Sequence, residues 1–202
     1  MAMPLPVRSD HSRRDWTVDE LRSLPDDGNR YEVIDGELFV TPAPSLLHQR
    51  AVIELLLLVR PYADRCSLDC YLAPAEVAFS QRRSVEPDLF VLPMLGGRRV
   101  AHFDEVKRLV LAVEVISPSS ARSDRHTKRH LYQSEAVPEY WIVDPDACLA
   151  ERWRPGDEAP DVLVESLTWA PRADVAALVI DLPTYFRRVH GEVESVSHRG
   201  ER

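Results

Sequence analysis

Residues 109–143 read LVLAVEVISPSSARSDRHTKRHLYQSEAVPEYWIV and contain, in order, the patterns of a strand, a helix and a second strand. The apolar run 109–116 is interrupted at one position, Glu114, which predicts a buried strand with one carboxylate set into it. The Ser-Pro-Ser-Ser segment that follows ends this strand, and the pattern is helical from about 123 to 136. Residues 140–143 begin the next apolar strand. This order indicates an α/β protein.

Glu114 needs a partner if its strand is buried, because an unpaired ionised carboxylate costs several kcal/mol inside a protein. The partner is a cation, a proton or a metal. The following helix carries Asp124, Lys128 and Tyr132 at intervals of four, so these side chains share one face. An internal Glu114–Lys128 ion pair that only holds strand and helix together explains this pattern as well as a functional site does.

The length and net charge of the chain narrow the possible classes of function but do not identify one. A chain of 202 residues is long enough for one well-cored domain. A formal net charge of −8 argues against a protein that coats nucleic acid without sequence preference, because such a protein needs a broad basic face. The charge is compatible with a metal-dependent nuclease, because the site of such an enzyme is acidic and its metal supplies positive charge.

The cysteines and the hydropathy pattern point to a protein of a reducing, cytoplasmic setting. Three cysteines, without zinc-like pairing, are expected to be structural thiols. No stretch reaches the roughly 18 apolar residues of a membrane span, and the N-terminus has no secretory h-region. We therefore expect no membrane association. Residues 1–15 are predicted to be a flexible segment, 16–190 a single domain and 191–202 a polar tail.

Short β-like runs and helical patterns make up the rest of the chain. The expected β runs are 31–34 and 37–41 around the Asp35-Gly36 turn, then 71–73, 75–79, 89–92, 149–153 and 162–168, with an apolar run at 176–180. The expected helices are a short one after Thr17, with capping-box spacing to Glu20, a longer one at 46–63 and a last short one at 182–189. Residues 80–84, which include Arg82 and Arg83, read as a turn.

Four charged positions form a pattern with a chemical meaning. Asp88 opens one apolar strand, Glu114 interrupts the next, Lys128 follows on a helix, and Glu32 lies in the earlier hairpin. Phosphodiester hydrolysis uses a divalent cation, which two carboxylates on neighbouring strands would hold, while an ammonium orients water or stabilises charge. Acids and lysines are common, so the spacing alone is no proof. Taken singly, Glu32 reads as a solvent-facing strand residue and His48 as a polar surface residue.

Several blocks, in this order, resemble one family. They are RYEVIDGELFVTPAPSLLHQ (30–49), VEPDLFV (85–91), AVEVISPSS (112–120), DRHTKRHLY (124–132) and VPEYWIVDP (137–145). Together they resemble the Uma-two family of restriction endonuclease-like proteins, within the PD-(D/E)xK nuclease superfamily, over roughly residues 16–190. The resemblance implies an α/β fold with a restriction-endonuclease-like core, in which a mixed central β-sheet is flanked by helices.

The resemblance also implies roles for individual residues. Asp88 at the PD position and Glu114 at the (D/E) position would bind Mg²⁺ or Mn²⁺, and the backbone carbonyl of Val115 would add an oxygen. Glu32 matches the upstream acid of such nucleases. The usual Lys position holds Ile116. The Lys role then falls to Lys128 on the next helix, with Tyr132 and Asp124 as its supports and His48, Gln49 and Ser117 as weaker candidates for the cleft.

Three functions remain open at this point. The first is a divalent-metal-dependent endonuclease whose partner is DNA, compatible with a homodimer because nucleases that cut both strands often act as dimers. The second is a non-catalytic interaction or regulatory protein that retains the nuclease fold, favoured by Ile116 in the Lys position, the acidic charge and the lack of an obvious basic stripe. The third is a metal-dependent hydrolase of RNA or another phosphoester.

Overall fold

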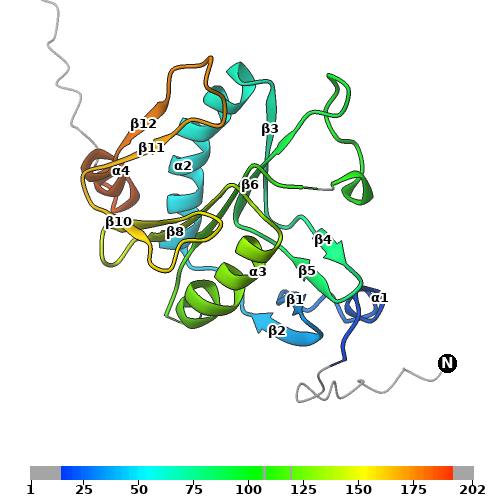
Figure 1. Cartoon of the computed structure of the whole chain (residues 1–202). Coiled ribbons are helices and arrows are strands. Elements are labelled where there is room, and N and C mark those ends of the chain that lie inside the picture. The colour runs from blue at the N-terminus through cyan, green and yellow to red at the C-terminus, as the bar shows by residue number, and fades with distance from the viewer. Residues whose placement is uncertain (1–14, 107, 119, 193–202) are drawn as a thin grey trace, which may run out of the picture.

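A six-stranded mixed sheet runs through the centre of the computed structural model, which describes residues 15–106, 108–118 and 120–192 (Figure 1). The strands lie in the order β10-β9-β8-β7-β6-β3. Their bounds are β3 (Leu68–Leu72), β6 (Leu89–Pro93), β7 (Leu111–Val115), β8 (Glu139–Asp144), β9 (Leu149–Trp153) and β10 (Asp161–Leu163). The N-terminal segment and most of the C-terminal tail named above lie outside the described residues.

The strand–helix–strand pattern of residues 109–143 forms the centre of this sheet. β7 and β8 are parallel, whereas the other neighbouring strands are antiparallel. A parallel pair needs a crossover connection. Here the crossover consists of η2 (Ser123–Lys128), which is a π-helix, and α3 (Arg129–Ser134). The predicted mixed central sheet is thereby confirmed, and the expected single α-helix is replaced in its first half by a π-helical segment.

A smaller sheet lies beside the first and has the strand order β2-β1-β5-β4. Its strands are β1 (Arg30–Ile34), β2 (Glu37–Thr41), β4 (Val77–Ser80) and β5 (Arg83–Val85). The predicted β1–β2 hairpin is confirmed, with positive φ at both Asp35 (53°) and Gly36 (84°), as the favoured two-residue turn requires.

The prediction of a plain turn over residues 80–84 was wrong, because Arg83 begins strand β5 and pairs with Ile34. The Arg83 guanidinium contacts the carboxylates of Asp35 and Glu135, both at 2.6 Å. These partners are distant in the sequence, so the local pattern gave no sign that a charged residue would enter a strand.

The remaining elements complete the layers around the sheets. They are α1 (Val18–Leu21), α2 (Leu46–Arg65), η1 (Phe103–Glu105), β11 (Ser166–Trp169), β12 (Leu178–Asp181) and α4 (Leu182–Val189). The capping box of Thr17 and Glu20 forms as predicted. The expected strand 162–168 is instead two strands, because β10 pairs with β9 whereas β11 pairs with β12. Within the described ranges, no helix has the length and apolarity needed to cross a membrane.

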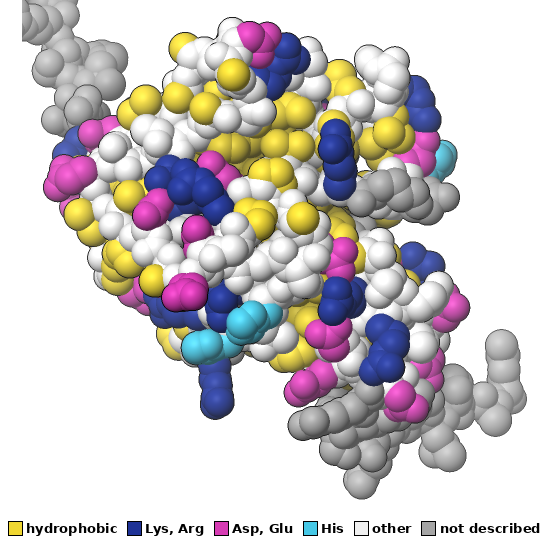
Figure 2. Space-filling view, viewed as in Figure 1, with side chains coloured by type: hydrophobic (Ala, Val, Ile, Leu, Met, Phe, Trp, Pro, Cys, Tyr) yellow, Lys and Arg dark blue, Asp and Glu magenta, His cyan; other side chains and the backbone are white. Residues whose placement is uncertain are grey.

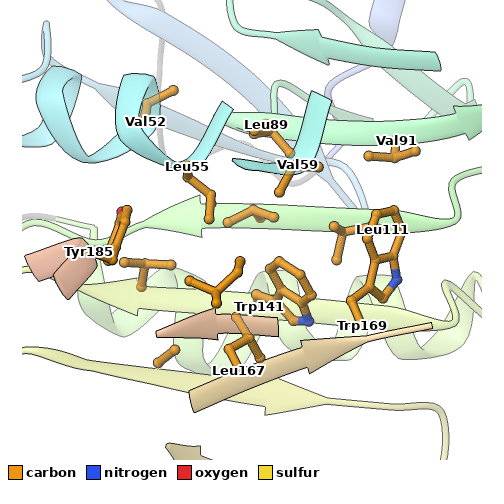
Figure 3. Close-up of a cluster of buried hydrophobic side chains, with 14 of the residues drawn as sticks. Val52, Leu55, Val59, Leu89, Val91, Leu111, Trp141, Leu167, Trp169 and Tyr185 are labelled. Atoms are coloured by element: carbon orange, nitrogen blue, oxygen red, sulfur yellow. The ribbon is translucent and has the colours of Figure 1, made fainter. Parts of the chain in front are cut away.

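One face of the central sheet carries an apolar core (Figure 3). Alternate residues of the strands point to it, and α2, α4 and the β11–β12 hairpin cover it. Trp141 of β8 is fully buried there and meets Trp169 of β11 edge to face, with 5.9 Å between ring centroids. This face anchors the predicted helices α2 and α4.

The opposite face packs against η2, α3 and the smaller sheet. Phe90, Ala112 and Ile142 contribute apolar side chains to it. The strand alternation also places Glu114 on this face, since its neighbours Val113 and Val115 lie in the apolar core on the other side. The functional candidates therefore collect on one side of the sheet.

Candidate active site

Glu114 lies in the middle of the site, in strand β7, and is 2% exposed. Its Oε1 accepts hydrogen bonds from Lys128 Nζ (3.1 Å) and from the Tyr132 hydroxyl (3.0 Å). Burial raises the pKa of Glu114 well above its usual range, although the positive charge of Lys128 acts against this rise. The predicted contact between strand and helix is present.

Lys128 binds three carboxylates at once. Its Nζ lies 2.8 Å from Glu32 Oε2, 3.1 Å from Glu114 Oε1 and 3.5 Å from Asp124 Oδ1. Burial alone would lower the pKa of Lys128, but the carboxylates outweigh it and raise that pKa well above its usual value. Lys128 is therefore held as an ammonium ion.

The π-helical segment η2 delivers both Asp124 and Lys128 to the site. Such segments are rare and concentrate at functional positions, because the wider turn re-aims side chains. Asp124 is 1% exposed and carries a pKa raised by burial. The Tyr140 hydroxyl, from β8 beneath, donates to the backbone carbonyl of Asp124 at 3.1 Å.

Glu32 comes from the smaller sheet and is 1% exposed. Its Oε1 accepts the backbone N–H of Glu86 at 2.8 Å, and its Oε2 contacts Lys128. The solvent-facing interpretation of Glu32 was wrong, because the smaller sheet turns this residue towards η2. The local sequence around Glu32 gave no sign that the smaller sheet packs against η2.

Asp88 stands just before β6 and is held by three groups. Its Oδ2 accepts the backbone N–H of Val115 (2.8 Å) and meets His48 Nε2 (3.0 Å), while its Oδ1 lies 2.9 Å from Arg30 Nη1. Burial acts to raise the pKa of Asp88, but the His48 hydrogen bond and the Arg30 charge outweigh it and lower that pKa to about 2. Asp88 is therefore an anion.

Two residues of this group were undervalued or missed in the sequence. His48, in the first turn of α2, is buried against Asp88 and is not a surface residue. Arg30 was not singled out at all. It lies two residues before Glu32 in a strand, and this spacing places both side chains on one face. That alternation was the available signal.

The site holds more negative than permanent positive charge. Its four carboxylates are Glu32, Asp88, Glu114 and Asp124, whereas its permanent cations are Arg30 and Lys128. Three carboxylate oxygens, one each on Glu32, Asp88 and Asp124, are buried without a hydrogen bond and make only charge contacts. Such an excess of buried negative charge favours the binding of a further cation or of protons.

Two adjoining pockets open onto these residues. The first, here called the acid pocket, has a volume of about 210 Å³ and is lined by Asp88, Glu114, Val115, Lys128 and Ser117, among others. The second, here called the side pocket, has a volume of about 320 Å³ and includes Gln49 in its lining. Both have Arg30, His48 and Asp88 in their walls. Ile116, in the usual Lys position, is instead buried among apolar side chains.

The outer face of η2 and α3 is basic, in contrast to the expectation that the chain lacks a basic stripe. We call it the basic ridge. Its residues are Arg122, which directly precedes η2, and Arg125, His126, Arg129 and His130, all exposed or half-buried. The Arg125 guanidinium is ion-paired with Asp144 and Glu151. Figure 2 shows Lys, Arg and His side chains gathered over the region of η2 and α3. Because Asp124 and Lys128 point inward, the same segment presents opposite faces to the site and to the solvent.

The mixed central sheet flanked by helices is a restriction-endonuclease-like fold. The family model described as "Uma2: Putative restriction endonuclease" matches residues 18–182, and the chain belongs to this family. A solved structure titled as a putative nuclease belonging to DUF820, from Anabaena variabilis, superposes with a TM-score of 0.68 at 18% identity, covering 86% of this chain and 98% of that one. No functionally curated protein matches the chain.

The structure thus brings together Glu32, His48, Asp88, Glu114, Asp124, Lys128 and Tyr132. The family and the fold are those that the sequence resemblance predicted. The chemical roles given to these residues remain predictions.

Proposed function

We propose that the protein is a divalent-metal-dependent nuclease that hydrolyses phosphodiester bonds of DNA. The observation that carries this proposal is the buried excess of carboxylates around Lys128 at the wall of the acid pocket. Membership of the family whose model is described as "Putative restriction endonuclease" supports the reaction class.

The donor set suits Mg²⁺ or Mn²⁺, which prefer oxygen ligands and retain several waters. Asp88 and Glu114 supply the carboxylates, and the second oxygen of Glu114 takes no hydrogen bond from the described residues. The N–H of Val115 points at Asp88, and in a strand the carbonyl of a residue faces the same edge as its N–H. The β6–β7 pairing ends at Val113, which leaves this carbonyl beyond the ladder.

The described residues do not form a complete metal centre on their own: no three His, Cys, Asp or Glu side chains converge on one point within them. Two carboxylates, one carbonyl and waters are therefore the expected ligand set. A bound divalent cation would neutralise phosphate charge and acidify a coordinated water.

The protein's own groups prepare the site for that chemistry. The hydroxyl of Tyr132 and the ammonium of Lys128 fix Glu114, while the Val115 N–H and His48 fix Asp88. Lys128, surrounded by carboxylates, acts as a cation that orients the attacking water and stabilises the charge that develops on phosphate. Because the surrounding carboxylates keep Lys128 protonated, it donates hydrogen bonds and does not act as the general base.

The basic ridge supports DNA as the partner. Phosphate backbones bind Arg side chains, and Arg122 and Arg129 of this ridge are exposed or half-buried on a chain with a net charge of −8. Ser117 and Ser120, which line the acid pocket, precede the ridge in the sequence.

Calorimetric titration of Mg²⁺ and Mn²⁺ tests the proposal. We expect binding by the parent protein, loss of binding in Asp88→Asn and Glu114→Gln, and a fall in plasmid nicking of about 100-fold or more. Asp69→Asn is the matched control, since Asp69 is an equally buried acid of β3 that pairs with Arg99 (3.0 Å) and does not line the acid pocket. Full nicking activity in Asp88→Asn at equal metal would contradict the site assignment.

A non-catalytic protein that retains the nuclease fold is the second candidate. It is favoured by Ile116 in the usual Lys position and by the ion pairs that already occupy Lys128. No metal binding by the parent protein would support this candidate. Cleavage of RNA in preference to DNA would instead identify the site as that of a ribonuclease.

A further inference from the structure

The side pocket adjoins the acid pocket and is not used by the proposed hydrolysis. At about 320 Å³ it is at the lower end of the range of small-ligand sites. The two pockets meet at Arg30, His48 and Asp88. Any group bound in the side pocket therefore lies directly beside the reacting phosphate.

The lining of the side pocket combines apolar walls with a hydrogen-bonding edge. Val52 and Ile53 of α2 and Leu72 at the end of β3 provide apolar surface. The Gln49 amide and the Glu86 carboxyl provide donors and acceptors. A nucleobase has this same chemistry: two apolar faces and a polar edge.

The depth of the acids restricts what can approach them. Asp88, Glu114 and Lys128 are only 2–4% exposed, so the phosphate must enter the acid pocket to meet them. A base-paired duplex is far wider than either pocket, whereas one strand with an unstacked nucleotide fits such a space. Enzymes that act in deep pockets use single strands or extrude the target nucleotide for this reason.

We propose that the side pocket receives one unpaired nucleoside of the substrate strand, next to the phosphate that is cleaved. The protein then cleaves single-stranded or locally unpaired DNA in preference to duplex. This inference rests on the proposed nuclease function. Arg30, at the junction of the two pockets, is the residue that positions the phosphate between them.

The first test measures binding without metal, so that it does not depend on activity. Fluorescence anisotropy of a labelled single-stranded oligonucleotide, in EDTA, compares the parent with Ile53→Trp, which fills the side pocket. Leu57→Trp is the matched control, because Leu57 is also an exposed residue of α2, one turn further on, and does not line the pocket. We expect about tenfold weaker binding in Ile53→Trp and no change in Leu57→Trp.

The second test measures cleavage of single-stranded and duplex forms of one sequence in Mg²⁺. We expect the parent to prefer the single strand and Ile53→Trp to lose that preference, with Gln49→Ala showing a smaller loss. Equal cleavage of both forms, or parent-like binding by Ile53→Trp, would overturn the inference and leave the nuclease proposal intact. Failure of the parent to bind metal or to cleave either form would overturn the nuclease proposal, while the anisotropy series would still decide whether the pocket holds a nucleoside.

Discussion

The two faces of the central sheet are built from the same strands but differ in what they bury. The face under α2 and α4 holds apolar side chains, including Leu111, Val113 and Trp141. The face under η2 and α3 mixes apolar residues with Asp88 and Glu114. A single-residue step along β7 separates the two environments.

The comparison shows where stability and chemistry reside. Apolar burial contributes about 25 cal/mol per Å² without needing a directional partner, so the α2 face stabilises the fold. Buried charges contribute little to stability and are costly when one partner is removed. The opposite face therefore holds an arrangement that suits a function better than it suits stability.

The largest expected effect comes from the apolar face. Trp141→Ala removes a fully buried ring and its contact with Trp169, and should lower the free energy of unfolding by about 3–5 kcal/mol. Urea denaturation measures this change. Glu114→Gln, on the other face, keeps the size of the side chain and leaves Lys128 paired with Glu32 and Asp124, so it should lower the free energy of unfolding much less. An equal loss in both variants would show that the two faces do not differ as described.

The next effect tests the charged face. Lys128→Met leaves four carboxylates with Arg30 as their permanent cation, and should lower the free energy of unfolding by about 3 kcal/mol. The double variant Lys128→Met with Glu114→Gln removes one negative charge as well. We expect it to recover part of the loss. A double variant no more stable than Lys128→Met would indicate that the excess of charge is unimportant.

A smaller effect, on DNA affinity, distinguishes the basic ridge from the buried charged residues on the inner side of η2. Arg122→Ala should reduce affinity for DNA a few-fold and lower the slope of log K against log salt by about 0.9, with stability almost unchanged. Arg187→Ala, at an exposed position of α4 next to the apolar face, is the control. Equal losses in both variants would remove the basic ridge as the DNA-binding surface.

The smallest effect concerns an acid at the rim of the apolar face. Burial raises the pKa of Glu139 above its ordinary value of 4.5, more than the Trp141 hydrogen bond lowers it. The folded state then holds a proton that the unfolded chain has lost, so this contribution to stability is present below pH 4.5 and disappears as the pH rises through the folded pKa. Relative to the parent, Glu139→Gln should gain stability between pH 4.5 and 7 in thermal denaturation. A constant difference across that range would contradict the shift.

The sequence by itself determined the layers and the central acids. Period-two and period-3.6 patterns predicted the hairpin, α2, α4 and the strand–helix–strand unit, because these elements depend on local turns, caps and amphipathic faces. Glu114 stood out because a carboxylate in an apolar strand demands a partner. Asp124, Lys128 and Tyr132 followed from their common helical face, and all of them reach the site.

Only the tertiary structure decided how the smaller sheet joins the site. Glu32 and Arg30 enter it from β1, and His48 enters it from α2, through contacts with residues about 40 to 100 positions away. The π-helical turn of η2, the strand at Arg83 and the basic ridge likewise depend on packing between elements. Local patterns record which face of an element is buried, but they do not record which distant element covers it. The charge balance of the site depends on which distant elements pack together. It could therefore be determined only from the folded structure.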